Sequence, residues 1–282
     1  MIFKNAMSFK AKIRQLATEK GLTTQQVQQS YLLERFLVRL SKSQYQANFI
    51  VKGGYLIGRM VGLNSRATMD LDTTIKGFEL TAENLAIIIE EILQMQVADS
   101  FTFEFIGVAE IREHDDYTGY RVKLLARYEK IQEPLTIDVT TGDVIIPKEL
   151  EVHFPQLFDE GEISLLAYPL ETVLAEKLET IVSRGTANTR PRDFYDVYIL
   201  QKMKAEYINL GVLKEALAGT MTKRKTHHLL AEFPLILSEI QSSEVQQSQW
   251  QKYQQQYVYA SDVAFQTVVE SVITLLNQLK SS

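Results

Sequence analysis

The chain has 282 residues, of which 45% are hydrophobic and 23% charged; its net charge is −5 and it has no cysteine. This length allows one large domain or two packed ones, and the ordinary balance of apolar and charged residues excludes a disordered or collagenous chain. The absence of cysteine excludes a disulfide scaffold, a thiolate zinc site and a thiol nucleophile. An acidic chain that binds a polynucleotide is expected to do so through a local basic patch.

The sequence shows no signal for a membrane. No run approaches the roughly 20 apolar residues of a membrane span, and the N-terminus lacks the apolar core of a secretory signal. We therefore expect a cytoplasmic protein without a membrane partner.

The first half of the chain mixes helical and strand-like patterns. The first forty residues predict helices, one of them capped by Thr23 or Thr24. A short strand over residues 48–52 runs directly into Gly53-Gly54 and a brief helix. Further strands are expected over residues 68–75, 101–111, 117–128 and 134–140, with a helix over 81–93.

From Pro169 onward the pattern is helical, with helices expected over residues 170–183, 192–202 and 212–218 and a last one starting near Ser261-Asp262. The glutamine-rich stretch 246–256 holds Trp250 and predicts an ordered surface helix. We expect an α+β fold: an α/β domain over residues 1–165, with N-terminal helices, and an α-helical domain over 166–282.

The segment Asp70-Leu71-Asp72 carries the clearest chemical signal. Alternate side chains of a strand share a face, so both carboxylates would project from one side, their Cα atoms about 6–7 Å apart. Such a pair can bracket one divalent ion or bridge two. The alternative is a solvated Asp-x-Asp on an exposed strand.

Asp138 repeats this pattern on a later strand, where Thr136, Asp138 and Thr140 share one face. If the two strands are neighbours, Asp138 becomes a third metal ligand or a base for an attacking hydroxyl. Oxygen ligands without cysteine favour Mg²⁺ or Mn²⁺ over zinc.

The turn Gly53-Gly54 lies between a strand and a helix, where backbone amides and a helix N-terminus can receive phosphate oxygens. A Gly-Gly turn alone is weak evidence. The order of strand, Gly-Gly turn, helix and Asp-x-Asp strand is far more specific.

This order resembles the DNA polymerase β-like nucleotidyltransferase superfamily, and more closely the AbiEii family of type IV toxin–antitoxin, abortive-infection toxins. The motifs that carry the resemblance cover roughly residues 48–200. They are Lys52-Gly53-Gly54, Arg66-Ala67-Thr68-Met69-Asp70-Leu71-Asp72, Glu176-Lys177-Leu178 and Arg192-Asp193-Phe194-Tyr195-Asp196.

The resemblance implies a polymerase β-like mixed sheet flanked by helices, whose helical C-terminal domain contributes to the active-site cleft. It implies nucleotide binding by Lys52, Gly53, Gly54, Arg66 and Thr68. Tyr55 stands where many superfamily members place a hydroxyl that touches the triphosphate, so backbone amides are expected to do that work alone.

Lys177 lies on an apolar stripe of its predicted helix, where a charge is costly unless it is paired. Its stem could lead the ammonium group to water. Alternatively, Lys177 points at the acidic site, binds the triphosphate and offsets charge on the leaving pyrophosphate, in which case its removal harms turnover more than folding.

Three other charged groups leave alternatives open. Asp193 either pairs with a helix N-terminus or, as the resemblance implies, belongs to the active site and orients Lys177 or activates the acceptor. Arg66 could contact phosphate or pair with Asp70. The basic run Lys223-Arg224-Lys225 is a solvated helix end or a local RNA patch. No role is predicted for Asp196.

We therefore expect a metal-dependent nucleotidyltransferase that moves NMP from an NTP to an acceptor hydroxyl, with Asp70, Asp72 and Asp138 as metal ligands and catalytic groups beside Lys177 and Asp193. The resemblance implies a toxin that acts on tRNA 3′ ends as a candidate acceptor and is neutralised by an antitoxin encoded nearby. The alternatives are transfer of NMP or phosphate to a protein or small molecule, and a non-catalytic nucleotide-binding module.

Overall fold

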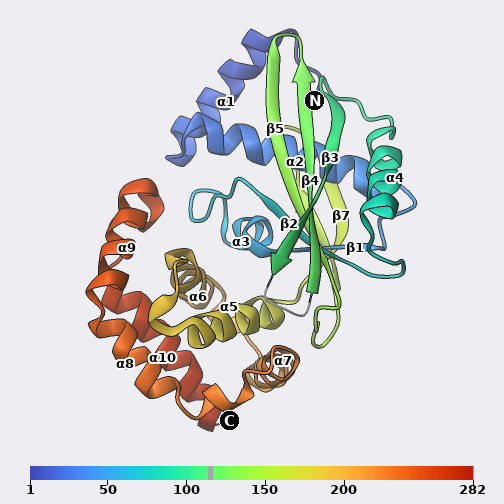
Figure 1. The fold of residues 1–282 in the computed structure, drawn as a ribbon. Helices are drawn as coiled ribbons and strands as arrows, with labels where there is room; N and C mark the ends of the chain where they lie inside the picture. The colour runs from blue at the N-terminus through green and yellow to red at the C-terminus, as the bar shows by residue number, and fades with distance from the viewer. Residues whose placement is uncertain (114–116, 282) are drawn as a thin grey trace. The chain divides into compact units, whose positions relative to one another are not determined.

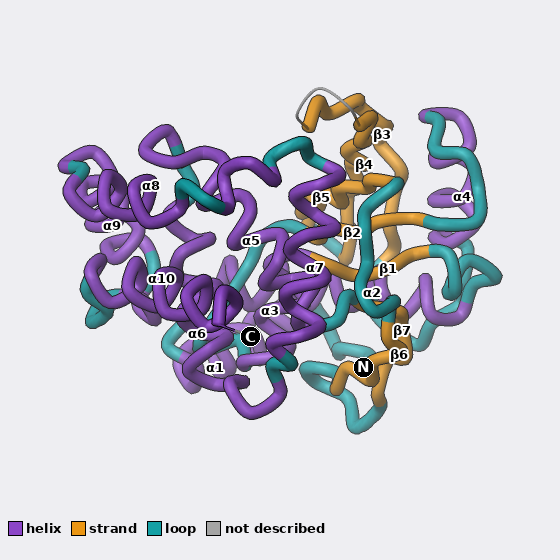
Figure 2. The backbone as a smooth tube through the Cα atoms, turned by 90° about the horizontal axis from the view of Figure 1, so that it is seen from below, coloured by secondary structure: helices purple, strands orange, loops and turns teal. Residues whose placement is uncertain are grey.

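The computed structural model describes residues 1–113 and 117–281. It divides into two units: unit 1 comprises residues 1–143 and 149–167, and unit 2 comprises residues 144–148 and 168–282. Within the described residues, all strands belong to unit 1 and unit 2 is helical (Figure 2). The boundary expected after residue 165 falls inside the last strand, and no local pattern indicated that residues 144–148 belong to unit 2.

Unit 1 is built on a seven-stranded mixed sheet with the order β3-β4-β5-β2-β1-β7-β6 (Figure 1). Strand β2 is antiparallel to β1 and parallel to β5, and β1 is parallel to β7. The expected α+β fold with a mixed sheet is confirmed. The strands are β1 (Phe49–Lys52), β2 (Leu71–Ile75), β3 (Thr102–Glu113), β4 (Tyr117–Tyr128), β5 (Ile131–Thr141), β6 (Leu150–Pro155) and β7 (Glu162–Ala167).

At the centre of the sheet, one face is apolar and fully buried. Leu71, Ile137 and Val122 are neighbours on β2, β5 and β4, and each is 0% exposed. Helix α2 passes behind the strands in Figure 1 and contacts β5 and β7. The helices of unit 1 are α1 (Ala6–Lys20), α2 (Thr24–Lys42), α3 (Gly53–Val61) and α4 (Ala82–Leu93).

A buried ionic network fixes α3 against α2. Glu34 of α2 is fully buried and accepts hydrogen bonds from Arg59 of α3 at 2.7 Å and from Arg35 at 2.6 Å. Arg59 also donates to the hydroxyl of Tyr55, at 2.8 Å from its Nη2, and burial raises the pKa of that hydroxyl. The Tyr55 hydroxyl is thus held inside unit 1 by Arg59.

One local prediction was wrong, and two strands were missed. The strand expected over 68–75 begins only at Leu71, because the amides of Ser65 and Arg66 turn back to the carbonyl of Gly62 and the segment then passes close to α3. Strands β6 and β7 were not expected. In β6 the apolar residues Leu150, Val152 and Phe154 alternate with Glu151 and His153, so the pattern was visible in the sequence, although only Phe154 is buried.

Unit 2 packs its helices around its own apolar core. Trp250 is 1% exposed and donates to the carbonyl of Val263 at 2.9 Å, so the glutamine-rich stretch is an ordered helix, as expected. Helix α8 was not expected. The α-helices are α5 (Leu170–Arg184), α6 (Pro191–Lys204), α7 (Leu210–Lys223), α8 (Phe233–Ser242), α9 (Glu244–Gln256) and α10 (Phe265–Ser281). Within the described residues, none of the chain's helices combines the length and apolar character needed to cross a bilayer.

The close packing of the Arg66 backbone against Gly58 of α3 can be tested by substitution. A Cβ atom at Gly58 would lie 2.5 Å from the carbonyl oxygen of Arg66, which is backbone and cannot swing aside. Gly58→Ala is expected to lower the free energy of unfolding by about 1–3 kcal/mol, as measured by urea denaturation and circular dichroism. Gly211→Ala is the matched control, because its nearest contact would be an ordinary 3.4 Å; equal decreases in stability for both variants would contradict this close approach.

Candidate active site

Four charged side chains form one row across the centre of the sheet of unit 1. The register pairs Lys52 with Asp72, Asp72 with Asp138, and Asp138 with Arg121. Directly paired residues on neighbouring strands project from the same face, with Cβ atoms roughly 4.5–5.5 Å apart. On the partly exposed face of the sheet, the row therefore has two carboxylates in the middle and one cation at each end.

Asp72 lies directly against the turn that opens α3. Gly53 has φ +66°, in the left-handed region that favours glycine, and a Cβ atom there would overlap Oδ2 of Asp72. Gly53 is therefore required both by the backbone and by the space that the Asp72 carboxylate occupies. The Asp72 carboxylate therefore lies beside the first residue of α3.

Asp70 lies just before β2, but it still reaches the same face. Its Oδ1 accepts a hydrogen bond of 3.0 Å from the hydroxyl of Thr136, which alternates with Asp138 on β5. The structure thus brings Asp70, Asp72 and Asp138 together on one face of unit 1. Their catalytic and metal-binding roles remain predictions.

Arg121 holds Asp138 in a bidentate salt bridge. Its Nε and Nη2 atoms donate to the two carboxylate oxygens of Asp138, both at 2.7 Å. This hydrogen bonding and the charge of Asp138 raise the pKa of Arg121. Sequence reasoning missed Arg121, although its alternation with Lys123 on β4 could have placed it on the exposed face.

Lys52 also has a carboxylate partner that was not predicted. Its Nζ lies 2.6 Å from Oδ2 of Asp143, and the hydroxyl of Thr140 donates to the same oxygen at 3.1 Å. Asp143 follows Gly142, which turns the chain at the end of β5. Both ends of the charged row are therefore neutralised within unit 1.

Arg66 and Thr68 lie over the first turn of α3. A Cβ atom at Gly54 would lie 3.0 Å from Nη2 of Arg66 and 3.0 Å from Oγ1 of Thr68. Arg66 is 4% exposed and donates from Nη1 to the carbonyl of Ala67. The predicted nucleotide-binding residues Gly53, Gly54, Arg66 and Thr68 thus gather around the start of one helix.

The oxygen donors of this face suit a hard divalent cation such as Mg²⁺. Asp70 and Asp72 have the required chemistry, whereas both oxygens of Asp138 are held by Arg121. Over residues 1–113 and 117–281, no three acidic or histidine side chains are arranged as a ready metal site. Asp138 would fit as a third ligand only after Arg121 turns away.

Unit 2 contains a charged cluster around Lys177. Its Nζ lies 2.7 Å from Oδ1 of Asp193 and 3.1 Å from Oδ2 of Asp196, and these aspartate side chains are 3% and 0% exposed. The i, i+3 spacing on α6 points both carboxylates at one ammonium group on α5. The half-buried Lys177 is therefore paired with both Asp193 and Asp196, and it does not lead to water unpaired.

The basic run contributes a residue to internal packing. Arg224 forms salt bridges with Glu179 and, at 3.4 Å, with Glu176, both on α5. Its guanidinium therefore helps to hold the end of α7 against α5.

Removing Lys177 is expected to destabilise unit 2, in addition to the expected loss of turnover. Lys177→Met would leave two buried carboxylates together, so the free energy of unfolding should fall by about 3–5 kcal/mol. Trp250 fluorescence in urea measures this for unit 2. Asp193→Asn in the same background should recover part of that stability, and Lys214→Met serves as an exposed control; an unaffected Lys177→Met protein would show that the cluster contributes nothing to stability.

The family model of the nucleotidyl transferase AbiEii toxin of type IV toxin–antitoxin systems matches residues 35–271. JHP933 from Helicobacter pylori is similar at 16% identity and a TM-score of 0.47, over 89% of this chain and 91% of its own. An antigenic nucleotidyltransferase-like protein from Paracoccidioides brasiliensis has 16% identity and a TM-score of 0.43, over 73% and 92%. No curated protein matches. The family match spans most of the sequence, and the chain therefore belongs to the AbiEii family of nucleotidyltransferase toxins.

Proposed function

We propose that the protein transfers NMP from a magnesium-bound (or manganese-bound) NTP to an acceptor hydroxyl. The observation that carries the proposal is the meeting of Asp72 with Gly53 at the start of α3. The amides at the start of α3 suit the anionic phosphate chain, and the Asp72 carboxylate suits the divalent cation that accompanies it.

The first turn of α3 supplies the phosphate contacts. The amides of Gly53 and Gly54 lie at a helix N-terminus, where anions are favoured. Arg66 and Thr68 lie close to Gly54 and can donate to the same phosphates. Lys52, at the end of β1, adds a positive charge that Asp143 holds in place.

Asp70 and Asp72 would hold the divalent cation, which when bound would neutralise the triphosphate. In the reaction, the acceptor oxygen forms a bond to the α-phosphorus, the bond to the pyrophosphate oxygen breaks, and the hydroxyl proton passes to a base. Asp138 is the candidate base or third ligand, and Arg121 must release it for either role. In unit 2, Lys177 has the chemistry to bind triphosphate oxygens, with Asp193 holding it.

As a member of a toxin–antitoxin family, the protein is expected to inhibit growth of its host and to be neutralised by an antitoxin encoded nearby. We propose the 3′ end of tRNA as the acceptor and the cytoplasm as the place of action. Labelled NTPs incubated with total RNA and with RNA-free extract separate an RNA acceptor from a protein or small molecule.

Asp70→Asn and Asp72→Asn should each abolish growth inhibition and label transfer, because each removes a negative ligand without changing side-chain size. Their melting temperatures should stay within about 2 °C of wild type. Asp262→Asn, an exposed aspartate outside the site, is the control. Toxicity that survives both substitutions would defeat the proposed mechanism.

Arg121→Gln tests whether Asp138 is a metal ligand. Freeing Asp138 from its bidentate partner should tighten Mn²⁺ binding about tenfold, because one charge-assisted hydrogen bond is worth roughly 1.5 kcal/mol or more. Isothermal titration calorimetry measures the change. Arg127→Gln is the control, since Arg127 lies on the same strand and pairs with Glu104. If the gain persists when Asp138→Asn is added, Asp138 does not bind the metal.

A further inference from the structure

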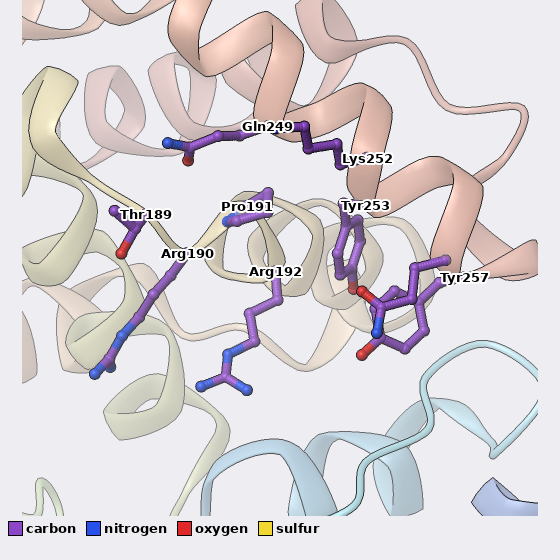
Figure 3. A pocket seen from close by; sticks show the side chains of 9 residues that line it. Thr189, Arg190, Pro191, Arg192, Gln249, Lys252, Tyr253 and Tyr257 are labelled. Atoms are coloured by element: carbon purple, nitrogen blue, oxygen red, sulfur yellow. The ribbon is translucent and has the colours of Figure 1, made fainter.

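Unit 2 contains a pocket of about 370 Å³ that is lined by none of the residues given a catalytic or nucleotide-binding role above (Figure 3). It lies between the start of α6 and the end of α9. Its volume is in the range of roughly 300–1,000 Å³ that is typical of ligand sites. The lining includes three cations, two tyrosines and an amide: Arg190, Arg192, Lys252, Tyr253, Tyr257 and Gln249.

The pocket concentrates positive charge. No aspartate or glutamate lines it, and among the described residues none of Arg190, Arg192 and Lys252 forms a salt bridge, in contrast to Lys177 and Arg224 of the same unit. Burial, followed by the nearby charge of Arg190, lowers the pKa of Arg184. The like charge around Arg190 favours an anion in this place.

The opposite wall offers aromatic surface. Tyr257 lies with its ring centroid 4.7 Å from that of Tyr253 and 5.3 Å from that of Tyr259. Tyr253 is buried against Trp250, so it supports the half-buried ring of Tyr257 from behind. Figure 3 shows the side chains of Arg190 and Arg192 extending in the same direction from the start of α6, with Tyr253 and Tyr257 on the α9 side.

We propose that this pocket binds one unpaired nucleotide of a single-stranded RNA end. The phosphates on either side of the nucleotide would contact Arg190, Arg192 and Lys252, and the base would stack on Tyr257, a combination that proteins use for single strands. Gln249 lines the pocket, and its buried Oε1 atom has no hydrogen-bond partner among the described residues. A rotation of this side chain would let Oε1 accept a hydrogen bond from the amino group of a base. The inference rests on the RNA acceptor of the proposed function and assigns its binding site.

The pocket suits a strand of RNA better than the NTP donor. A magnesium-bound triphosphate needs carboxylates for its cation, and the pocket offers none. Singly charged phosphodiesters need cations alone. The basic run at the end of α7 is a weaker candidate, because Arg224 is bound to Glu176 and Glu179.

Binding of a fluorescein-labelled single-stranded RNA oligonucleotide to the whole protein, followed by anisotropy over a series of salt concentrations, tests the pocket. The double variant Arg192→Gln/Lys252→Gln should bind more weakly. Its slope of log K against log salt should be shallower by about 1.4, because each phosphate that is no longer neutralised reduces the slope by about 0.7. The matched control is Lys10→Gln/Lys214→Gln, which removes the same charge from exposed lysines on α1 and α7; its slope should be unchanged.

The aromatic wall is tested with Tyr257. Tyr257→Leu should weaken binding about fivefold or more while the salt slope stays the same, because it removes stacking and not charge. Tyr257→Phe keeps the ring and should bind as wild type does. RNA containing 5-bromouracil should form photo-crosslinks that map to Tyr253 or Tyr257.

Three results would overturn the inference. The first is that the wild-type protein does not bind the oligonucleotide, and the second is that the two double variants have equal salt slopes. The third is that a magnesium-bound NTP displaces the RNA as well as unlabelled RNA does, and that Arg192→Gln/Lys252→Gln abolishes the binding of that NTP. The last would make the pocket a donor site. The proposed function fails separately: if RNA binds at the pocket but no NMP is transferred to any RNA, the pocket stands and the transferase proposal does not.

Discussion

The placement of β2 between a parallel and an antiparallel neighbour is the constraint on which the catalytic face depends. Together with the pairing of β4 and β5, it sets Lys52, Asp72, Asp138 and Arg121 in one row, whatever the rotamers of their side chains. A shift of β2 by one residue would turn both Asp70 and Asp72 to the apolar face. The buried residue Leu71, between the two aspartates, makes that shift costly, so the hydrophobic core itself holds the acidic site in register.

The neighbouring carboxylates of this face would repel one another, and cations at both ends of the row offset that repulsion. Arg121 neutralises Asp138 and Lys52 meets Asp143. A cation that binds Asp138, or a phosphate that binds Arg121 or Lys52, must therefore compete with an existing partner. This arrangement links substrate binding to the rearrangement of salt bridges that are already formed in unit 1.

Local patterns predicted the elements that carry the motifs. The strand before Gly53, the helix after Gly54 and the alternation around Asp138 are features of short segments, and each was visible in the sequence. Arg121 and Asp143 were missed because their roles depend on which strands become neighbours, and that is decided by packing far along the chain. The pocket around Tyr257 was missed for the same reason: its walls come from two helices separated by dozens of residues.

Because residues 144–148 belong to unit 2, the two units cannot be expressed separately by cutting the chain at a single position. Thr172 of α5 accepts from the amide and donates to the carbonyl of Ile146, and the side chains of Val144 and Ile146 lie close to Gly219 of α7. A helical fragment that starts after Ala167 would lack this peptide and expose the groove that it fills. The segment between β5 and β6 thus completes the packing of unit 2. A recombinant form of unit 2 therefore needs this segment, either added as a peptide or joined to the helical sequence.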